Sequence, residues 1–162
     1  MENPTYRHVV EVNFSDTDAS GWAHFTNIFK YVEAAEHAFL RSRNILIFDR
    51  AQGGWPRVKV AGDYKRPLLC GDQIEVQLSI LRLRASTITW HFEILNSDGD
   101  IAALGTMTTV RVNQQGRPQE INETERQRLE GVVDTDRAPN KCRSAIAPAI
   151  SATNSPPSSA PD

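Results

Sequence analysis

The sequence has little of several features that would place a protein in a specialised class. It holds only two cysteines in 162 residues, Cys70 and Cys142, too few for a disulfide framework, which favours a reducing compartment such as the cytoplasm. Its 18 basic and 20 acidic residues leave a formal net charge of −2, which argues against general binding to nucleic acid or to a membrane surface. It has no apolar run of about 18 residues, so we expect no membrane span. Its first residues lack the basic and then apolar pattern of a signal peptide.

Several familiar catalytic motifs are also missing. The sequence has no Gly-x-Ser-x-Gly elbow, no glycine-rich phosphate loop and no cysteine–histidine set with the spacing of metal ligands. The pair Asp16 and Asp18 does not begin an EF-hand loop, because further oxygen ligands and a closing glutamate are not at the required spacing. We therefore expect neither a bound metal nor a retained cofactor.

One stretch, residues 13–44, combines an amphipathic helix with a polar turn before it. Apolar side chains recur there at three- and four-residue spacing, which predicts a helix with one buried face. The members of that face are Ile28, Tyr31 or Val32, Ala35 and Phe39. Three charged or titratable residues lie off this stripe: Glu33, Glu36 and His37. Asn44 is suited to a left-handed helix stop.

The remainder of the ordered chain is predicted to be strands joined by turns. Alternating or β-prone side chains indicate strands at residues 5–14, 55–64, from 73 into the eighties, 87–95 and 101–113. The apolar phase slips after Ile80, which predicts a β-bulge near residues 80–82. Residues 45–54 are predicted to be a loop, with room for a short helical piece, and residues 122–130 a short polar helix capped by Asn122. One long helix with several antiparallel strands predicts an α+β fold in which the sheet covers the helix.

The composition changes near residue 138. Residues 138–162 hold five of the nine prolines, much serine and alanine, and few charges. Such a segment buries too little apolar surface to offset the entropy of ordering. The sequence therefore predicts one domain at residues 1–137 and a disordered tail at residues 138–162.

The turn at residues 16–27 is the candidate active site. Asp16 and Asp18 follow a predicted strand and precede the helix, where a fixed carboxylate can take a proton from water or attack a carbonyl. The helix N-terminus supplies unpaired backbone N–H groups that can polarise a carbonyl oxygen. Together these parts are suited to acyl transfer. The same aspartates before a glycine are also ordinary turn chemistry, and Trp22 and Phe25 are predicted to be packing residues.

Two motifs resemble a known family. The first is FSDTDASG at residues 14–21, followed by Asn27, Tyr31 and Glu33; the second is DYKRPL at residues 63–68, followed by Gly71 and Asp72. Both resemble the hotdog-fold acyl-CoA thioesterases. The nearest branch is the 4-hydroxybenzoyl-CoA thioesterase family, which includes the bacterial thioesterases of the Tol–Pal gene cluster. The resemblance covers roughly residues 5–120.

The resemblance implies a hotdog fold, in which a curved antiparallel sheet wraps around one long central helix. It implies active sites at the interface of a homodimer or homotetramer. It also implies an enzyme that hydrolyses an acyl-CoA to a free acid and coenzyme A, which is a leaving group. Asp18 matches the catalytic aspartate of the family, and Phe25 falls where a backbone N–H polarises the thioester carbonyl. Arg84 falls near a position that holds the phosphates of coenzyme A in some members.

Four other residues are weaker candidates. Arg82, Lys65 and Arg66 are chemically suited to the same phosphates, although each is equally an ordinary exposed charge. Several members of the family carry a histidine where this chain has Phe25, whereas His24 comes one place earlier. That departure leaves an acid–base role for His24 open.

The sequence also leaves two other functions open on the same fold. One is a hydratase or dehydratase that acts on acyl thioesters and pairs a histidine with a carboxylate. The other is a non-enzymatic module that binds acyl groups. The fold by itself does not separate these functions, because function depends on the site.

Overall fold

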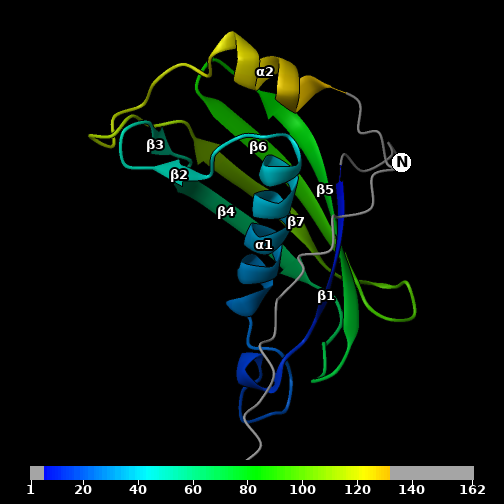
Figure 1. Cartoon of the computed structure of the whole chain (residues 1–162). Helices are drawn as coiled ribbons and strands as arrows, with labels where there is room; N and C mark the ends of the chain where they lie inside the picture. Colours follow the sequence, from blue (N-terminus) through cyan, green and yellow to red (C-terminus); the bar gives the residue numbers. More distant parts are fainter. Residues whose placement is uncertain (1–5, 132–162) are drawn as a thin grey trace, which may run out of the picture.

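A five-stranded antiparallel sheet, ordered β1-β5-β6-β7-β4, supports the described part of the chain, residues 6–131 (Figure 1). In this computed structural model the strands are β1 (Tyr6–Glu11), β4 (Arg57–Tyr64), β5 (Gln73–Leu83), β6 (Thr87–Leu95) and β7 (Ile101–Val110). Helix α1 (Asn27–Ser42) lies against one face of the sheet, and α2 (Glu123–Glu130) lies over one end. The predicted α+β class and antiparallel sheet are confirmed. The predicted tail, residues 138–162, lies outside the described residues.

The face of α1 that the spacing predicted is buried against the sheet. Its members, each no more than 5% exposed, are Ile28, Tyr31, Val32, Ala35 and Phe39. The Phe39 ring meets the Trp90 ring of β6 edge-on, with 5.5 Å between the centroids. Each large apolar side chain buried in this way contributes about 1.5–3 kcal/mol. The helix ends as predicted, because Asn44 adopts the left-handed conformation with a φ of 54°.

The central strands β5 and β6 supply the other half of the core. Their buried side chains alternate along each strand: Ile74, Val76 and Leu78 in β5, and Ile88, Trp90, Phe92 and Ile94 in β6. The pairing register shifts between Ile80 and Arg82, which confirms the predicted bulge. The bulge restores the apolar phase, so that Ile80 and Leu83 both pack against the core while Leu81 is exposed.

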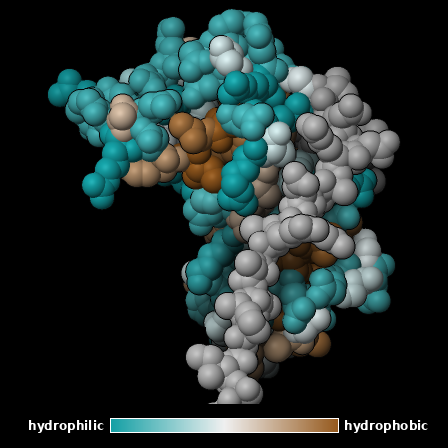
Figure 2. All heavy atoms as spheres, viewed as in Figure 1, coloured by the Kyte–Doolittle hydropathy of each residue, from teal (hydrophilic) through white to brown (hydrophobic). Residues whose placement is uncertain are grey.

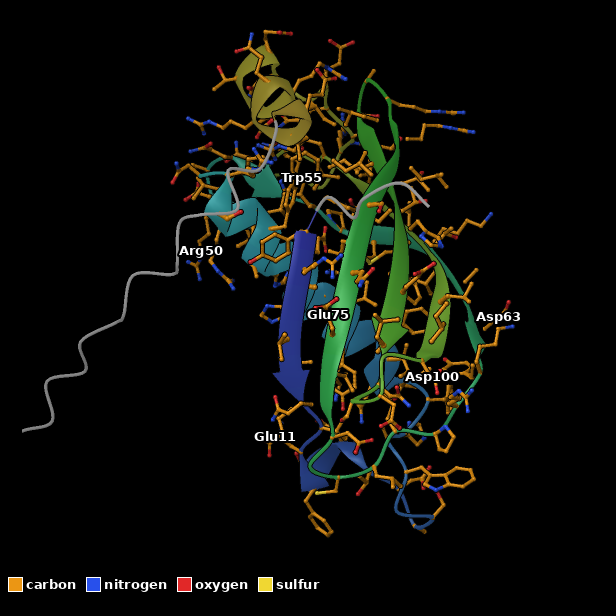
Figure 3. The ribbon with its side chains drawn as sticks, turned by 90° about the vertical axis from the view of Figure 1, so that its right-hand side faces the viewer. Glu11, Arg50, Trp55, Asp63, Glu75 and Asp100 are labelled. Atoms are coloured by element: carbon orange, nitrogen blue, oxygen red, sulfur yellow. The ribbon has the colours of Figure 1, made fainter. Side chains whose placement is uncertain are left out.

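The first strand is shorter than predicted. Strand β1 ends at Glu11, and the chain then enters a 3₁₀ turn, η1 (Phe14–Asp16), at the end of the sheet labelled by Glu11 in Figure 3. The Asp16 N–H donates to the Asn13 carbonyl at 2.9 Å, which closes this turn. The extension of the strand to residue 14 was therefore wrong, and Phe14 is 82% exposed instead of half-buried.

Residues 45–54 form a small ladder instead of a helical piece. Strand β2 (Phe48–Asp49) pairs with β3 (Gly53–Gly54), and the Asp49 carboxylate accepts the N–H groups of Ala51 and Gln52 across the turn. Gly53 has a φ of +86°, and a Cβ there would lie 2.0 Å from the Val112 carbonyl oxygen, so only glycine fits. Figure 2 shows apolar surface between the end of α1 and this ladder, where Leu46 and Phe48 are exposed.

Helix α2 forms as predicted. The Asn122 side chain accepts the Glu125 N–H at 2.8 Å, and the Glu125 carboxylate accepts the Asn122 N–H, which is a capping box. Leu129 is the buried residue of this polar helix. Neither helix in residues 6–131 is long and apolar enough to cross a membrane.

One residue of α1 departs from the helical pattern. Glu36 lies off the apolar stripe, yet its side chain is only 1% exposed. The cause is Arg57 at the start of β4, whose guanidinium contacts Glu36 at 2.5 Å and Glu33 at 2.9 Å. The apolar stripe therefore predicts fewer buried residues than α1 has, because the Arg57 side chain from a distant strand covers a second sector of the helix.

Candidate active site

The loop between η1 and α1 is closed by backbone hydrogen bonds. The Asp18 N–H donates to the Trp22 carbonyl at 2.9 Å, and the Gly21 N–H donates back to the Asp18 carbonyl at 2.9 Å. Gly21 has a φ of 79°, which favours glycine at the tip, as the sequence predicted. The result is a tight turn that presents Asp18 at the surface next to the start of α1.

The two oxygens of the Asp18 carboxylate differ in their surroundings. Oδ1 accepts the Ser20 N–H at 2.8 Å and also a short hydrogen bond from the Ser20 hydroxyl. Among residues 6–131, no donor reaches Oδ2. The Ser20 hydroxyl, followed by the Ser20 N–H, lowers the pKa of Asp18 below its ordinary value. The carboxylate is thus ionised at neutral pH and has one oxygen fixed and the other open.

Asp16 has a different environment two residues earlier. Its Oδ2 accepts the Asn13 N–H at 3.1 Å and the Tyr31 hydroxyl at 3.0 Å. Its carbonyl accepts the His24 N–H at 2.8 Å and the Asn27 side-chain amide at 2.6 Å. Burial, and then the bond to Asp16, raises the pKa of Tyr31, so the phenol stays a donor. Asp16 therefore ties the turn to the first turns of α1.

Phe25 presents a free N–H group just before α1. The hydrogen bonds of residues 6–131 include none from this N–H, while the Phe25 carbonyl accepts the Tyr64 hydroxyl at 3.0 Å. Residue Phe25 is 60% exposed and Trp22 is 51% exposed, so the prediction that both are packing residues was wrong for the single chain. The reason is that the turn projects beyond the end of the sheet, where no strand covers it.

The ring of His24 is held locally. Its Nδ1 lies 2.7 Å from the Thr26 hydroxyl oxygen, and its ring stacks at a tilt on Phe25, with 4.5 Å between the centroids. No hydrogen bond between His24 and Asp18 occurs in the part of the chain that the structure describes. His24 therefore lies near the candidate carboxylate without orienting it.

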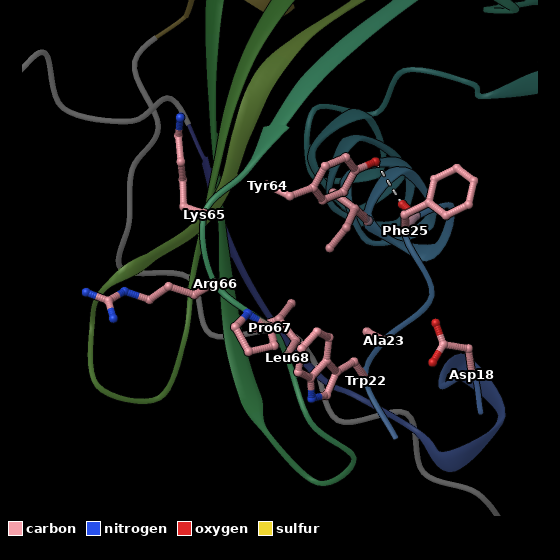
Figure 4. A pocket seen from close by; sticks show the side chains of 10 residues that line it. Asp18, Trp22, Ala23, Phe25, Tyr64, Lys65, Arg66, Pro67 and Leu68 are labelled. Carbon is pink, nitrogen blue, oxygen red and sulfur yellow. Dashed lines mark hydrogen bonds between the residues drawn. The ribbon is translucent and has the colours of Figure 1, made fainter. Parts of the chain in front are cut away.

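A hollow of about 360 Å³ separates this turn from the segment that follows β4. Its lining includes Asp18, Trp22, Phe25, Tyr64, Lys65 and Arg66 (Figure 4). The Ala23 N–H donates to the Leu68 carbonyl at 2.8 Å, and Trp22 bridges to Leu69, so the backbone joins both walls. The two sequence motifs thus lie side by side. The volume is within the range of small-molecule sites, about 300–1,000 Å³.

The four candidate basic residues lie away from the Asp18 carboxylate. Lys65 and Arg66 line the hollow with their stems, but their side chains extend away from Asp18 in Figure 4 and pair with acids. Lys65 lies 3.6 Å from Asp63, and Arg66 lies 3.4 Å from Asp100.

Arg82 and Arg84 lie at the opposite end of β5 from the turn. Gln73, the first residue of β5, pairs with Glu11 just before η1. At the other end, just after β5, the Arg84 carbonyl accepts a hydrogen bond from the Arg126 side chain of α2. Since a strand rises about 3.3 Å per residue, the length of β5 separates the two ends by about 30 Å. A single chain does not bring these arginines to the hollow.

Two contributors to the site were not singled out from the sequence. Ser20 holds the Asp18 carboxylate, and Tyr64 bonds to the Phe25 carbonyl. A serine two residues after an aspartate is typical of a local Asx turn, so the first contact had a readable signal. The second joins residues 39 positions apart and had none.

Comparison with known proteins agrees with this architecture. Residues 12–147 match the family described as the thioesterase-like superfamily. A protein of Aquifex aeolicus, provisionally named as an esterase, is 33% identical over 97 residues, which cover 59% of this chain and 76% of that protein. The 1,4-dihydroxy-2-naphthoyl-CoA hydrolase of Gloeothece citriformis is 28% identical over 137 residues, which cover 73% of this chain and 94% of that protein.

Solved structures show the same fold. The 1,4-dihydroxy-2-naphthoyl-CoA thioesterase of Synechocystis superposes with a TM-score of 0.71 at 19% identity, over 76% of this chain and 94% of that chain. The sheet and the helix α1 packed on it therefore form a hotdog-like fold.

Proposed function

The chain belongs to the thioesterase-like superfamily, and we propose that it hydrolyses the thioester of an acyl-coenzyme A to a free acid and coenzyme A. One observation carries this proposal: Asp18, an ionised carboxylate with an open oxygen, and Phe25, whose backbone N–H has no partner within residues 6–131, both line the same hollow. The first is suited to act as a base or nucleophile, and the second to hold a developing oxyanion. We also propose that the chain belongs to the 4-hydroxybenzoyl-CoA thioesterase branch and that it acts in the cytoplasm.

Asp18 and the Phe25 N–H would act on the two ends of one carbonyl group. In the general-base route, Asp18 Oδ2 takes a proton from water, and the hydroxide equivalent attacks the thioester carbon. The carbonyl oxygen becomes an oxyanion that the Phe25 N–H and the positive end of the α1 dipole stabilise. The carbon–sulfur bond then breaks, and the thiolate of coenzyme A takes the proton from Asp18.

Asp18 could instead attack the thioester carbon itself. The same oxyanion would form, coenzyme A would leave as a thiolate, and water would open the resulting acyl-aspartyl anhydride. A single turnover in ¹⁸O-water tests this route, because label entering Asp18 would show an anhydride opened at the enzyme carbonyl. Label found only in the released acid would favour direct attack by water, or opening at the acyl carbon.

The environment of Asp18 suits either route. The Ser20 bonds lower the pKa of Asp18, so the free protein holds it as a carboxylate at neutral pH. An acyl group that covers the turn would remove water from the carboxylate, which raises the pKa of Asp18 and its strength as a base. We assign no step to His24, since its ring is bonded to Thr26.

We further propose that the active unit is a homodimer or homotetramer in which a second subunit brings Arg84, assisted by Arg82, to the phosphates of coenzyme A. Strand β4 supports the assembly, since among residues 6–131 it pairs with β7 alone and exposes Val58 and Val60 along an open edge. The distance along β5 supports the second subunit as the source of the arginines. Light scattering at micromolar concentration should find an oligomer, and a monomer would refute this arrangement.

Arg84→Ala tests the phosphate contact. We expect the KM for an acyl-CoA to rise about tenfold, the typical effect of one lost charge-assisted bond. The KM for the corresponding N-acetylcysteamine thioester, which lacks the nucleotide, should not change. Arg7→Ala is a matched control, because Arg7 pairs with Glu75 on β5, away from the β5–β6 turn. Equal effects on both thioesters would remove the assignment.

A panel of aromatic and aliphatic acyl-CoA substrates, read by release of free thiol, tests the function itself. The wild-type protein should hydrolyse at least one of them, and Asp18→Asn should hydrolyse none at a comparable rate. Binding of an acyl-CoA without release of thiol by the wild-type protein would contradict hydrolysis. That outcome would favour an acyl-binding module instead.

A further inference from the structure

Tyr64 joins the two walls of the hollow through its side chain. It is the last residue of β4, its ring lines the hollow, and its hydroxyl donates to the Phe25 carbonyl at 3.0 Å (Figure 4). The backbone that carries it is fixed, because the Lys65 and Arg66 N–H groups both donate to the Ala102 carbonyl, at 2.8 and 3.1 Å. Tyr64 is thus a rigid donor aimed across the hollow at the turn.

Other hydrogen bonds hold the turn on both sides of Phe25. On the C-terminal side, the Asn27 N–H donates to the His24 carbonyl at 2.8 Å and the Thr26 N–H donates to His24 Nδ1 at 3.4 Å, so Tyr64 adds a bond from a distant strand to these local ones. Two more bonds lie on the N-terminal side. The His24 N–H donates to the Asp16 carbonyl, and the Ala23 N–H donates to the Leu68 carbonyl, each at 2.8 Å. The peptide that follows Phe25 carries the bond from Tyr64, while the peptide that precedes it carries the free N–H. Because each peptide is planar, the two are related by only two backbone angles at Phe25. A bond that fixes the second peptide therefore restricts the direction of the first.

We propose that Tyr64 is a positioning residue that holds the Phe25 N–H in the direction needed to polarise the thioester carbonyl. This inference rests on the proposed function, in which that N–H meets the developing oxyanion. The Tyr64 hydroxyl touches neither the acyl group nor water in the reaction; it acts through the Phe25 backbone. Burial raises the pKa of Tyr64, so the phenol remains a protonated donor throughout the neutral range.

Tyr64→Phe isolates the hydroxyl, because the ring that lines the hollow is kept. We expect kcat to fall about 3- to 10-fold, the effect of one neutral hydrogen bond, with KM within about twofold of wild type. Tyr6→Phe is the matched control: in the described residues the Tyr6 hydroxyl has no hydrogen bond, and its ring packs on Phe39. Its kcat should not change. An unchanged kcat in Tyr64→Phe would overturn the proposal.

Two unreactive analogues separate positioning from a general loss of structure. In the first, a methylene replaces the thioester sulfur and the carbonyl remains; in the second, a thioether lacks the carbonyl. Tyr64→Phe should weaken binding of the ketone about 3- to 10-fold and leave the thioether unchanged. Equal weakening of both analogues would overturn the positioning role, since a merely structural residue would affect both.

The Phe25 amide reports on the proposal without activity. If the wild-type protein hydrolyses no acyl-CoA, the proposed function fails, and the NMR order parameter of this amide then decides the role of Tyr64. A lower order parameter at Phe25 in Tyr64→Phe than in Tyr6→Phe would support the positioning of its backbone. Equal order parameters in the two variants would overturn it.

Discussion

Two acidic residues near the beginning of the chain, Asp18 and Glu36, have opposite environments. In the turn before α1, Asp18 is exposed, and the bonds from Ser20 lower its pKa. In the middle of α1, Glu36 is 1% exposed, and burial raises its pKa to about 7, although Arg57 acts in the opposite direction. Arg57 bridges Glu36 and Glu33.

The comparison shows how one functional group serves either chemistry or the fold. A carboxylate with an open oxygen at a hollow is available to a substrate. A carboxylate enclosed by protein and held by a guanidinium is unavailable, and it joins α1 to β4 instead. The difference also separates the expected effects of mutation, since loss of the first should change activity and loss of the second should change stability.

The largest effect is expected at the exposed Asp18. Asp18→Asn keeps the size of the side chain and one acceptor for Ser20, but it removes the base or nucleophile. We predict a loss of about 10²–10⁴-fold in kcat, the range of a positioned acid–base group, and more if Asp18 attacks covalently. The melting temperature should stay near that of the wild type. Near-normal turnover would end the assignment of the site.

At the buried Glu36 the corresponding change should act on stability. Arg57→Met leaves Glu36 buried without its partner, and we predict a loss of about 3–5 kcal/mol in the free energy of unfolding at pH 8. Urea unfolding measures it. Arg7→Met is the control, because the exposed pair of Arg7 and Glu75 is worth about 0–1 kcal/mol. Equal losses in the two variants would show that the burial of Glu36 does not increase the cost of removing its partner.

The raised pKa of Glu36 predicts a pH dependence of stability. The folded protein binds this proton more tightly than the unfolded chain does, since the pKa rises from 4.5 to about 7 on folding. The stability from this group is therefore fully present below about pH 4.5 and is lost as the pH rises through about 7, by at most about 3 kcal/mol.

Glu36→Gln removes the titration and nearly preserves the shape. The difference in unfolding free energy between the variant and the wild type should shift in favour of the variant between pH 5 and pH 8. His37, whose pKa burial lowers, is common to both proteins, so its titration largely cancels in the difference. A difference that does not vary with pH would contradict the raised pKa.

A smaller loss is expected at Asp16, the other aspartate of the turn. Asp16→Asn weakens the bonds from the Asn13 N–H and the Tyr31 hydroxyl, so we predict a loss of about 1–2 kcal/mol in unfolding free energy. Its loss of kcat should be smaller than that of Asp18→Asn. Tyr31→Phe removes one of the same bonds and should reproduce part of the destabilisation. An activity loss equal to that of Asp18→Asn would mean that both aspartates take part in the chemistry.

The smallest effect is expected at Ser20. Ser20→Ala removes the hydroxyl that contributes most to lowering the pKa of Asp18, so that pKa should rise. The acid limb of kcat/KM, which reports the free protein, should then move to higher pH. Ser15→Ala is the control, since the exposed Ser15 side chain makes no hydrogen bond within residues 6–131. An acid limb that does not move would show that a group other than Asp18 controls it.

The sequence alone determined the elements whose signals are local. Strand β6 begins and ends where the alternation predicted, the bulge in β5 follows the slip of apolar phase, and Asn44 and Asn122 mark helix ends. These features depend on neighbours within a few residues, and such neighbours can be read in one dimension. The hydrogen bonds of Asp18 itself belong to the same class, because they span at most four residues.

Only the tertiary structure decided the surroundings of the acids and the walls of the hollow. Glu36 is buried because Arg57, 21 positions away, reaches it from β4. Trp22 and Phe25 are exposed because the turn projects past the sheet, and Tyr64 reaches Phe25 because β4 ends beside the start of α1. Helical periodicity shows which residues share a face, but it contains no information on which strand will cover the next face. That depends on strand order and register, which are set by packing of the whole chain.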